Sequence, residues 1–189
     1  MELETFEDIL GFNNKEDVKA LAFGNQLQEK IIFSTNVAQK INKFQQGPPA
    51  QLFMSESGTI FLSSTNDEGQ MVIMRTFNLM NLKAMTLLEP EKTQQPLRSF
   101  ILHHKTQWDS VLSCGDVNVR NKITMAVKYK HWTLFKSNLP IYRIPEKQLN
   151  RIVVKKERQN DQGVSRKINL PEKYRDFSQD MYAIGSIAA

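Results

Sequence analysis

The sequence predicts an α+β fold, with N-terminal helices packed on an antiparallel β-meander and with a basic strand pair and an extended tail toward the C-terminus. Two observations lead to this prediction. Apolar residues recur at helical spacing before residue 46, whereas strand-like segments separated by turn residues follow the breaker at residues 46–49. The 189 residues and the 40% hydrophobic fraction suffice for one core. We therefore expect a single domain over residues 1–150, followed by a basic arm and an apolar tail over residues 151–189.

Two helical segments are predicted ahead of the breaker. Residues 2–12 suit a short amphipathic helix that ends at Gly11. Such a helix either folds back on its own core or docks in the groove of a partner. Residues 15–45 carry two apolar stripes that do not join, which indicates two helices with a break, or a short strand, near residues 33–36.

Three strands form the predicted meander, over residues 51–57, 59–65 and 70–77. Gly58 separates the first two strands, and the turn at residues 66–69 separates the second from the third. Turn residues at these places are what hairpins require.

The second half of the chain alternates between the two kinds of element. Residues 79–88 suit a strand or a short helix, and the loop at residues 89–96, with two prolines, is the candidate hinge within the domain. Apolar spacing predicts a helix over residues 97–113. A strand over residues 119–136 and a short strand over residues 141–144 form the basic strand pair.

Charge is divided unevenly along the chain. Residues 1–100 hold 9 Lys/Arg and 12 Asp/Glu, a net −3, and residues 101–189 hold 16 and 8, a net +8, which together give +5. A half this basic attracts nucleic acid, anionic lipid or an acidic protein surface, although a plain solvated surface has the same composition.

The sequence also predicts where in the cell the protein is found. The one cysteine cannot form an intramolecular disulfide, and the acidic N-terminus argues against a secretory signal or transit peptide. No apolar run is long enough to span a bilayer. We therefore expect an intracellular protein, cytoplasmic or nuclear, without a transmembrane segment.

Composition and spacing favour a protein with no catalytic activity, no cofactor and no metal. His103, His104, Cys114 and His131 could supply four zinc ligands, but none of the usual ligand spacings is present. Cys114 with a histidine and Asp116 could form a thiol nucleophile and its base, yet no nucleophile signature surrounds it. No glycine-rich phosphate-binding loop occurs. A cysteine-dependent enzyme is therefore the least favoured alternative.

The strand predicted over residues 119–136 supplies the candidate binding surface. Successive side chains of a strand point to opposite faces, so Lys128, Lys130 and Trp132 share one face. Two such lysines lie about 7 Å apart, close to the spacing of phosphates along one strand, and a tryptophan can stack on a base. The other interpretation places Trp132 in the core and has the lysines protect an edge strand. The predicted nucleic-acid-binding residues are Arg120, Lys122, Lys128, Lys130, Trp132, Lys136, Lys155, Lys156, Arg158, Arg166 and Lys167.

These observations predict a non-enzymatic, nucleic-acid-associating protein that works as a homo-oligomer, with RNA as the preferred nucleic acid and a viral-type structural or accessory role as one form of that function. The alternative is a self-assembling, matrix-like protein that contacts an anionic membrane surface and protein partners. The apolar tail supplies the predicted oligomerisation residues Met181, Tyr182, Ile184 and Ile187. If the two halves fold together, the acidic residues 2–12 could cover the basic strand.

Overall fold

The structure is a computed structural model that describes residues 28–40, 46–91, 96–148 and 170–181. Eight strands form one sheet in the order β4-β3-β2-β1-β7-β6-β5-β8. All neighbours are antiparallel except β5 and β8, which are parallel. The strands are β1 (Ile31–Lys40), β2 (Gln46–Ser55), β3 (Thr59–Thr65), β4 (Met71–Asn78), β5 (Leu82–Glu89), β6 (Arg98–His104), β7 (Ser110–Cys114) and β8 (Ile141–Pro145).

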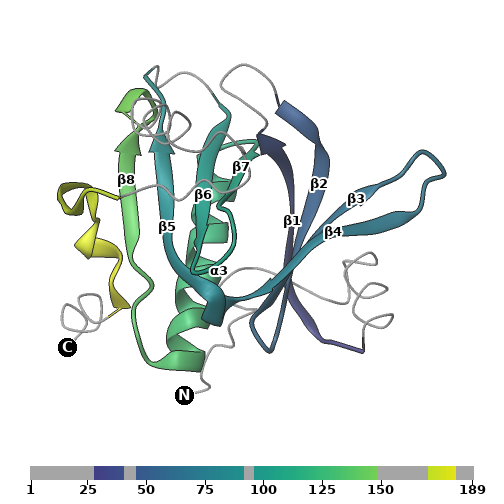
Figure 1. Cartoon of the computed structure of the whole chain (residues 1–189), viewed down its shortest axis with the longest axis horizontal. Coiled ribbons are helices and arrows are strands. Elements are labelled where there is room, and N and C mark those ends of the chain that lie inside the picture. Colours follow the sequence, from purple (N-terminus) through teal and green to yellow (C-terminus); the bar gives the residue numbers. More distant parts are fainter. Residues whose placement is uncertain (1–27, 41–45, 92–95, 149–169, 182–189) are drawn as a thin grey trace.

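Within the described residues, one long helix, α3 (Val117–Phe135), packs against this sheet, and Figure 1 shows it behind β6 and β7. Short 3-10 helices η1 (Leu79–Asn81), η2 (Glu172–Tyr174) and η3 (Phe177–Gln179) complete the described elements. Within the described parts of the chain, no helix combines the length and apolar character needed to cross a membrane.

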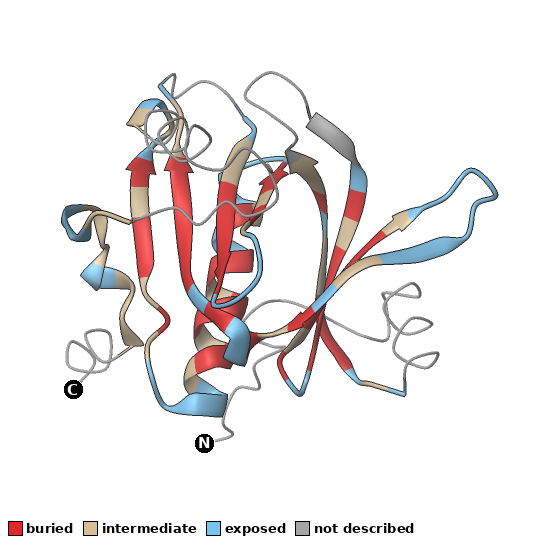
Figure 2. Ribbon diagram, viewed as in Figure 1, coloured by how far each residue is buried: buried red, intermediate tan, exposed pale blue. Residues whose placement is uncertain are grey.

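The two halves of the sheet meet at a short junction. Strands β1 and β7 pair over only two positions, Ala38 with Ser113 and Gln39 with Leu112. Helix α3 packs against both halves at this junction. Its buried residues Ile123, Ala126 and Val127 belong to one core together with apolar residues of both halves. Figure 2 shows this core as buried segments of α3 and of the strands around it.

The predicted fold class is wrong, because the described chain is mainly a large mixed sheet with one long helix rather than helices packed on a meander. The segment 31–40, expected within a helical region, is strand β1. Its β-branched Ile31 and Ile32 are both buried, which suits a strand covered on both faces better than an amphipathic helix. The short strand weighed near residues 33–36 lies within β1. Predicted helical residues 1–27 lie outside the described part of the chain.

In two later segments the secondary structure is the opposite of the prediction, with strands where a helix was predicted and a helix where a strand was predicted. Residues 97–113, predicted as a helix, contain strands β6 and β7, and residues 119–136, predicted as a strand, contain α3. Both faces of β6 are buried, from Phe100 to His104, so its apolar residues do not alternate with polar ones and the pattern imitates a helix. The meander itself is present, because β2, β3 and β4 pair in order.

The glycines of the two meander turns have different surroundings. Gly58 and Gly69 both have positive φ, +84° and +78°, the left-handed region that favours glycine. A Cβ atom on Gly58 would lie 2.5 Å from Cδ1 of Leu134 in α3, whereas a Cβ on Gly69 meets nothing within 4 Å. Close packing of the β2–β3 turn on α3 therefore depends on Gly58.

We predict that Gly58→Ala lowers the free energy of unfolding by about 2 kcal/mol, from backbone strain and from displacement of Leu134. The matched variant Gly69→Ala carries only the strain and should lose about 1 kcal/mol. Urea denaturation of the two variants measures the difference. Equal losses would show that the contact with α3 contributes nothing.

Candidate functional site

The helical conformation of residues 117–135 separates the residues that a strand would have aligned. Asp116 caps the start of α3, accepting a hydrogen bond from the Val119 amide at 2.9 Å. The helix ends at Lys136, which has a left-handed φ of +53°. Side chains two positions apart on a helix point in widely different directions. Lys128 and Lys130 therefore do not form the predicted two-lysine face.

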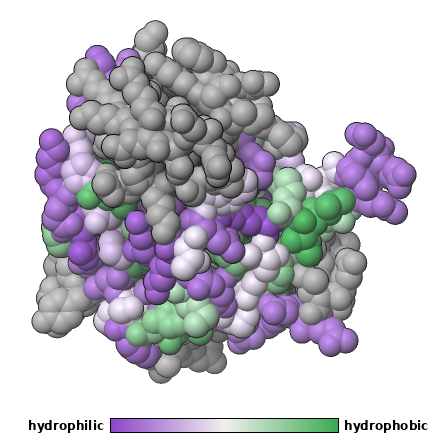
Figure 3. Space-filling model, in the orientation of Figure 1, coloured by the Kyte–Doolittle hydropathy of each residue, from purple (hydrophilic) through white to green (hydrophobic). Residues whose placement is uncertain are grey.

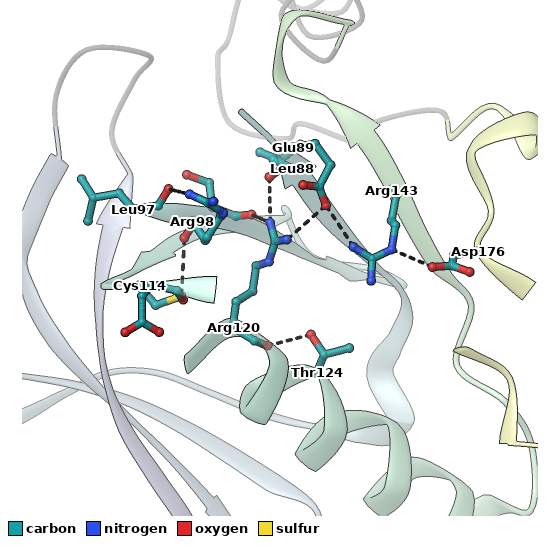
Figure 4. Close-up of polar contacts among 11 residues, drawn as sticks. Leu88, Glu89, Leu97, Arg98, Cys114, Arg120, Thr124, Arg143 and Asp176 are labelled. Atoms are coloured by element: carbon teal, nitrogen blue, oxygen red, sulfur yellow. Dashed lines mark hydrogen bonds and ion pairs between the residues drawn. The ribbon is translucent and has the colours of Figure 1, made fainter. Parts of the chain in front are cut away.

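Arg120 is part of the interior. Its side chain is 1% exposed, and Nη1 donates to the Leu88 carbonyl at 2.7 Å while Nη2 meets Oε1 of Glu89 at 3.1 Å. The same Glu89 oxygen accepts from Arg143 Nη1 at 3.0 Å, and Arg143 Nε donates to Asp176 at 2.7 Å. Figure 4 shows this chain running from α3 through β5 and β8 to the C-terminal segment. Arg120 therefore joins elements of the fold and presents no group to a ligand.

Lys128 and Lys130 are also buried. Lys128 Nζ donates to Oε1 of Gln179 at 3.3 Å, and burial lowers the pKa of this lysine although Asp176 partly opposes the shift. Trp132 is half-buried. The interpretation that a solvent-facing strand presents these three side chains is wrong, because the helix packs them against the rest of the domain.

The remaining predicted residues divide into exposed ones and ones outside the description. Lys122 and Lys136 are exposed. Met181 is half-buried, and its amide donates to Oδ1 of Asn138 at 2.7 Å, so this part of the tail contacts its own chain. The residues outside the described part of the chain are Lys155, Lys156, Arg158, Arg166, Lys167, Tyr182, Ile184 and Ile187.

We predict that Arg120→Met lowers the free energy of unfolding by about 2–3 kcal/mol, because the Leu88 carbonyl loses its partner in a buried site. Lys122→Met, on the exposed side of the same helix, should change stability by less than about 0.5 kcal/mol. Thermal and chemical denaturation measure both. A neutral Arg120→Met would show that apolar packing replaces the ionic contacts at no cost.

A second polar group surrounds the two adjacent histidines. His103 and His104 occupy successive positions of β6 and so point to opposite faces of the sheet. His103 bridges Thr86 Oγ1 through Nε2 and Asp109 through Nδ1, each at 2.7 Å. A carboxylate, an imidazole and a hydroxyl in series is an arrangement that can activate a nucleophile. Here Thr86 and His103 are both 0% exposed, so no substrate reaches the hydroxyl, and the array acts as a buried hydrogen-bond network.

His104 belongs to a separate chain of hydrogen bonds. Arg75 donates to the Ser110 hydroxyl, and Ser110 Oγ lies 3.1 Å from His104 Nε2. Arginine can only donate, so Ser110 Oγ accepts from Arg75 and uses its remaining hydrogen-bonding capacity toward Nε2 of His104. The His104 ring meets Phe77 edge-on, with centroids 4.5 Å apart. Burial, and then the charge of Arg75, lower the pKa of His104 from 6.5 to about 4. Arg75 also donates to the Trp108 carbonyl at 2.6 Å, so it ties β4 to the β6–β7 turn.

The histidines and Cys114 do not form the metal site or the thiol site that was weighed from the sequence. Among the described residues, no group of three or more His, Cys, Asp or Glu side chains could hold a metal ion. Cys114 is buried, and burial raises the pKa of its thiol to about 11, so it is protonated near neutral pH. Sequence analysis singled out both histidines but missed their partners in β5, β4 and the β6–β7 hairpin, since strand pairing rather than spacing brings them together.

The lowered pKa of His104 predicts that the protein loses stability in mild acid. The unfolded imidazole takes up a proton near pH 6.5, whereas the folded one resists protonation down to about 4, so the unfolded chain binds more protons throughout this window. The free energy of unfolding therefore falls as pH falls, by at most about 3 kcal/mol from this group. His104→Gln, which cannot titrate, should lower the slope of that free energy against pH by up to about 1.4 kcal/mol per pH unit. Denaturation curves across the window test this, and an unchanged slope contradicts it.

A basic and aromatic surface lies where α3 ends, and we call it the basic end: Lys83, Lys105, Phe135 and Lys136. The Lys105 amide donates to the Asn81 carbonyl at 2.8 Å, which places it beside the start of β5 and Lys83. His131 connects this strand end to α3. Its ring lies 5.0 Å from that of Phe135, and Lys105, after burial, contributes to its lowered pKa. All three lysines are exposed, and Phe135 is 38% exposed.

Comparisons with known proteins give a fold but no family. No protein-family model matches the chain, and no curated protein matches it. Among solved structures, the hSac2 domain of the human phosphoinositide phosphatase Sac2 is similar with a TM-score of 0.51 and 14% identity, over 75% of this chain and 92% of that domain. The chain therefore shares its fold with that domain.

Two further solved structures are similar to a smaller degree. A structure of Vav1 with an allosteric inhibitor has a TM-score of 0.46 and 9% identity, over 64% of this chain and 24% of that one. The PDZ-RhoGEF DH/PH domains in complex with RhoA have a TM-score of 0.38 and 13% identity, over 66% of this chain and 40% of that one.

Proposed function

We propose that this chain is a non-enzymatic nucleic-acid-binding protein that uses the basic end as its contact surface. The observation that carries this proposal is the exposed ring of Phe135, which directly precedes the exposed Lys136 and lies 5.0 Å from the ring of His131, on whose pKa the charge of Lys105 acts. An aromatic face among cations is the combination with which proteins bind single strands without reading their sequence.

The charges of the basic end act together. Lys83 and Lys105 lie at the ends of neighbouring strands, because Leu82 pairs with His104. Lys136 lies at the C-terminal end of α3, where the helix dipole is negative and partly offsets its charge. Residues 101–189 carry a net +8, a balance that favours attraction of a polyanion to this half of the chain.

The two candidate reactive groups that the structure describes are closed to solvent, which agrees with a binding role. Within the described residues, the Thr86–His103–Asp109 array is closed to solvent and the Cys114 thiol is buried. A homo-oligomer and a role as a viral structural or accessory protein remain predictions from the sequence.

The alternative polyanion is an anionic membrane surface. Met80 and Leu134, which are 55% and 38% exposed, lie on η1 and on the last turn of α3, and Leu134 and Leu79 both approach Gly58. Exposed apolar side chains beside lysines also suit a lipid headgroup layer. Binding a nucleic-acid single strand requires fewer exposed apolar side chains than insertion into lipid. Nucleic acid is therefore the first candidate.

We predict that the double variant Lys83→Gln with Lys136→Gln binds labelled single-stranded RNA more weakly than the wild type. Removing two phosphate contacts should reduce the slope of log K against log salt by about 1.4. Phe135→Ala should cost about 1–3 kcal/mol of binding free energy without changing that slope, because stacking is not ionic. Fluorescence anisotropy over a salt series measures both quantities.

Lys147→Gln is the matched control, since Lys147 is exposed but follows the end of β8, at the opposite end of the sheet from the start of β5. Its affinity and salt slope should equal those of the wild type. Affinity that is unchanged in the double variant contradicts the proposal. Binding to phosphatidylserine vesicles with no binding to RNA assigns the basic end to a membrane surface instead.

A further inference from the structure

The edge strand β4 carries an uncovered apolar segment. Among the residues that the structure describes, β4 pairs with β3 on one side and with no strand on the other. Met71, Val72 and Ile73 are 40%, 43% and 40% exposed, although they are consecutive and would normally alternate between a buried and an open face. Figure 3 shows hydrophobic surface next to the hydrophilic tip of the projecting hairpin.

The opposite edge of the sheet is protected. Residues 170–181, which we call the C-terminal strap, run beside β8, where Arg175 forms a bridge with Tyr142 and the Asp176 amide donates to the Ile141 carbonyl at 2.7 Å. Proteins commonly protect free edges in this way, or with lysine, proline or a bulge. Residues 70–73 contain neither a charge nor a proline, and the bulge at Met74 comes only after them.

The backbone of β4 presents unpaired groups at this edge. In the β3–β4 hairpin, the Asn66 amide donates to the Gln70 carbonyl at 2.8 Å, so these two residues form a hydrogen-bonded pair. Pairs alternate along an antiparallel ladder, and the hydrogen bonds of Val72 are therefore directed to Ser64 in β3. The amide and carbonyl groups of Met71 and Ile73 point the other way, toward the free edge.

The outer part of the hairpin lacks the support that the rest of the sheet has. Pairing between β2 and β3 ends at Gln51 with Ser63, so beyond Ser63 the hairpin has two strands only. Figure 1 shows the hairpin projecting from the body of the domain. A two-stranded hairpin is marginally stable in water, and a further strand on its apolar edge would stabilise it.

We propose that the free edge of β4 binds the same edge of a second copy of this chain, in an antiparallel, two-fold symmetric pairing centred on Val72. In this register the backbone amide and carbonyl groups of Met71 in each copy form hydrogen bonds with those of Ile73 in the other. The outward-facing backbone groups of both residues are then paired. The two Val72 side chains face one another across the axis, and apolar residues also lie opposite one another at the flanking positions. Where the two hairpins meet, the result is four neighbouring strands, with β4 of each copy in the middle and β3 of each copy on the outside.

Charge complementarity favours a second copy over another partner. The tip of the hairpin carries Asp67 and Glu68, and Arg75 follows the apolar segment. Antiparallel pairing brings the acidic tip of each copy toward Arg75 of the other, whose charge attracts the tip while its guanidinium keeps its contacts with Ser110 and the Trp108 carbonyl. Residues 70–74 carry no charge, so no like charges meet along the pairing. The contact is short, so the dimer is weak and depends on concentration.

The test uses sedimentation velocity on the full chain across micromolar to near-millimolar concentration. The wild type should show a reversible monomer–dimer equilibrium. Val72→Lys and Val72→Glu should each weaken it by at least about tenfold, because like charges then meet at the axis. An equimolar mixture of the two variants should dimerise again. Ile73→Pro should also weaken the dimer while keeping the hairpin, since the amide of residue 73 faces outward.

Matched controls separate this edge from other surfaces. Thr65→Lys places the same charge on the exposed end of β3, away from the axis, and should leave the dimer unchanged. Truncation after Met181 should also leave it unchanged. Circular dichroism checks that each variant is folded. A wild type that stays monomeric, a Val72→Lys variant that dimerises as the wild type does, or equal weakening by Thr65→Lys would overturn the proposal. A dimer lost on truncation would assign the interface to the tail.

Discussion

The buried guanidinium of Arg120 adds a polar connection among elements that strand pairing and the shared core also hold together. It reaches from the first turns of α3 to the ends of β5, and through Glu89 it is linked to Arg143 in β8 and then to Asp176 of the C-terminal strap. A buried charge is costly unless it is paired and hydrogen-bonded, and here Nη1 and Nη2 have partners while Nε has none. The contact therefore favours one placement of the first turns of α3, and the apolar core contacts of Ile123, Ala126 and Val127 fix the rest of the helix that ends at Phe135.

A second set of arginine hydrogen bonds connects the other half of the sheet. Arg75 extends from β4 to Ser110 and to the Trp108 carbonyl in the β6–β7 hairpin. Strand pairing between the two halves covers only two positions of β1 and β7, so the common core and side-chain contacts of this kind supply the rest of the connection. Both connections use arginine, whose planar guanidinium donates hydrogen bonds in several directions and so reaches several acceptors in one place.

The two proposed surfaces would reinforce one another. The basic end lies where α3 stops, and the free β4 edge lies on a hairpin that projects from the body. A dimer formed through β4 carries two basic ends, and a polyanion long enough to reach both would bind more tightly than either alone. Weak dimerisation and modest local charge could then still give firm association, provided that the ligand spans both copies.

The sequence by itself determined the β2–β3–β4 meander, because Gly58 and the polar turn at residues 66–69 separate strand-like segments as hairpin turns do. It also contained the start of α3, since Asp116 is a good cap, but lysines at alternate positions outweighed that signal in the prediction of a strand. Only the tertiary structure decided that Lys128 and Lys130 are buried and that Arg120 is internal, because long side chains extend along a helix to partners distant in sequence. The same holds for the free edge of β4, since whether a strand lies at an edge depends on which strands pair, and local pattern carries no information about that.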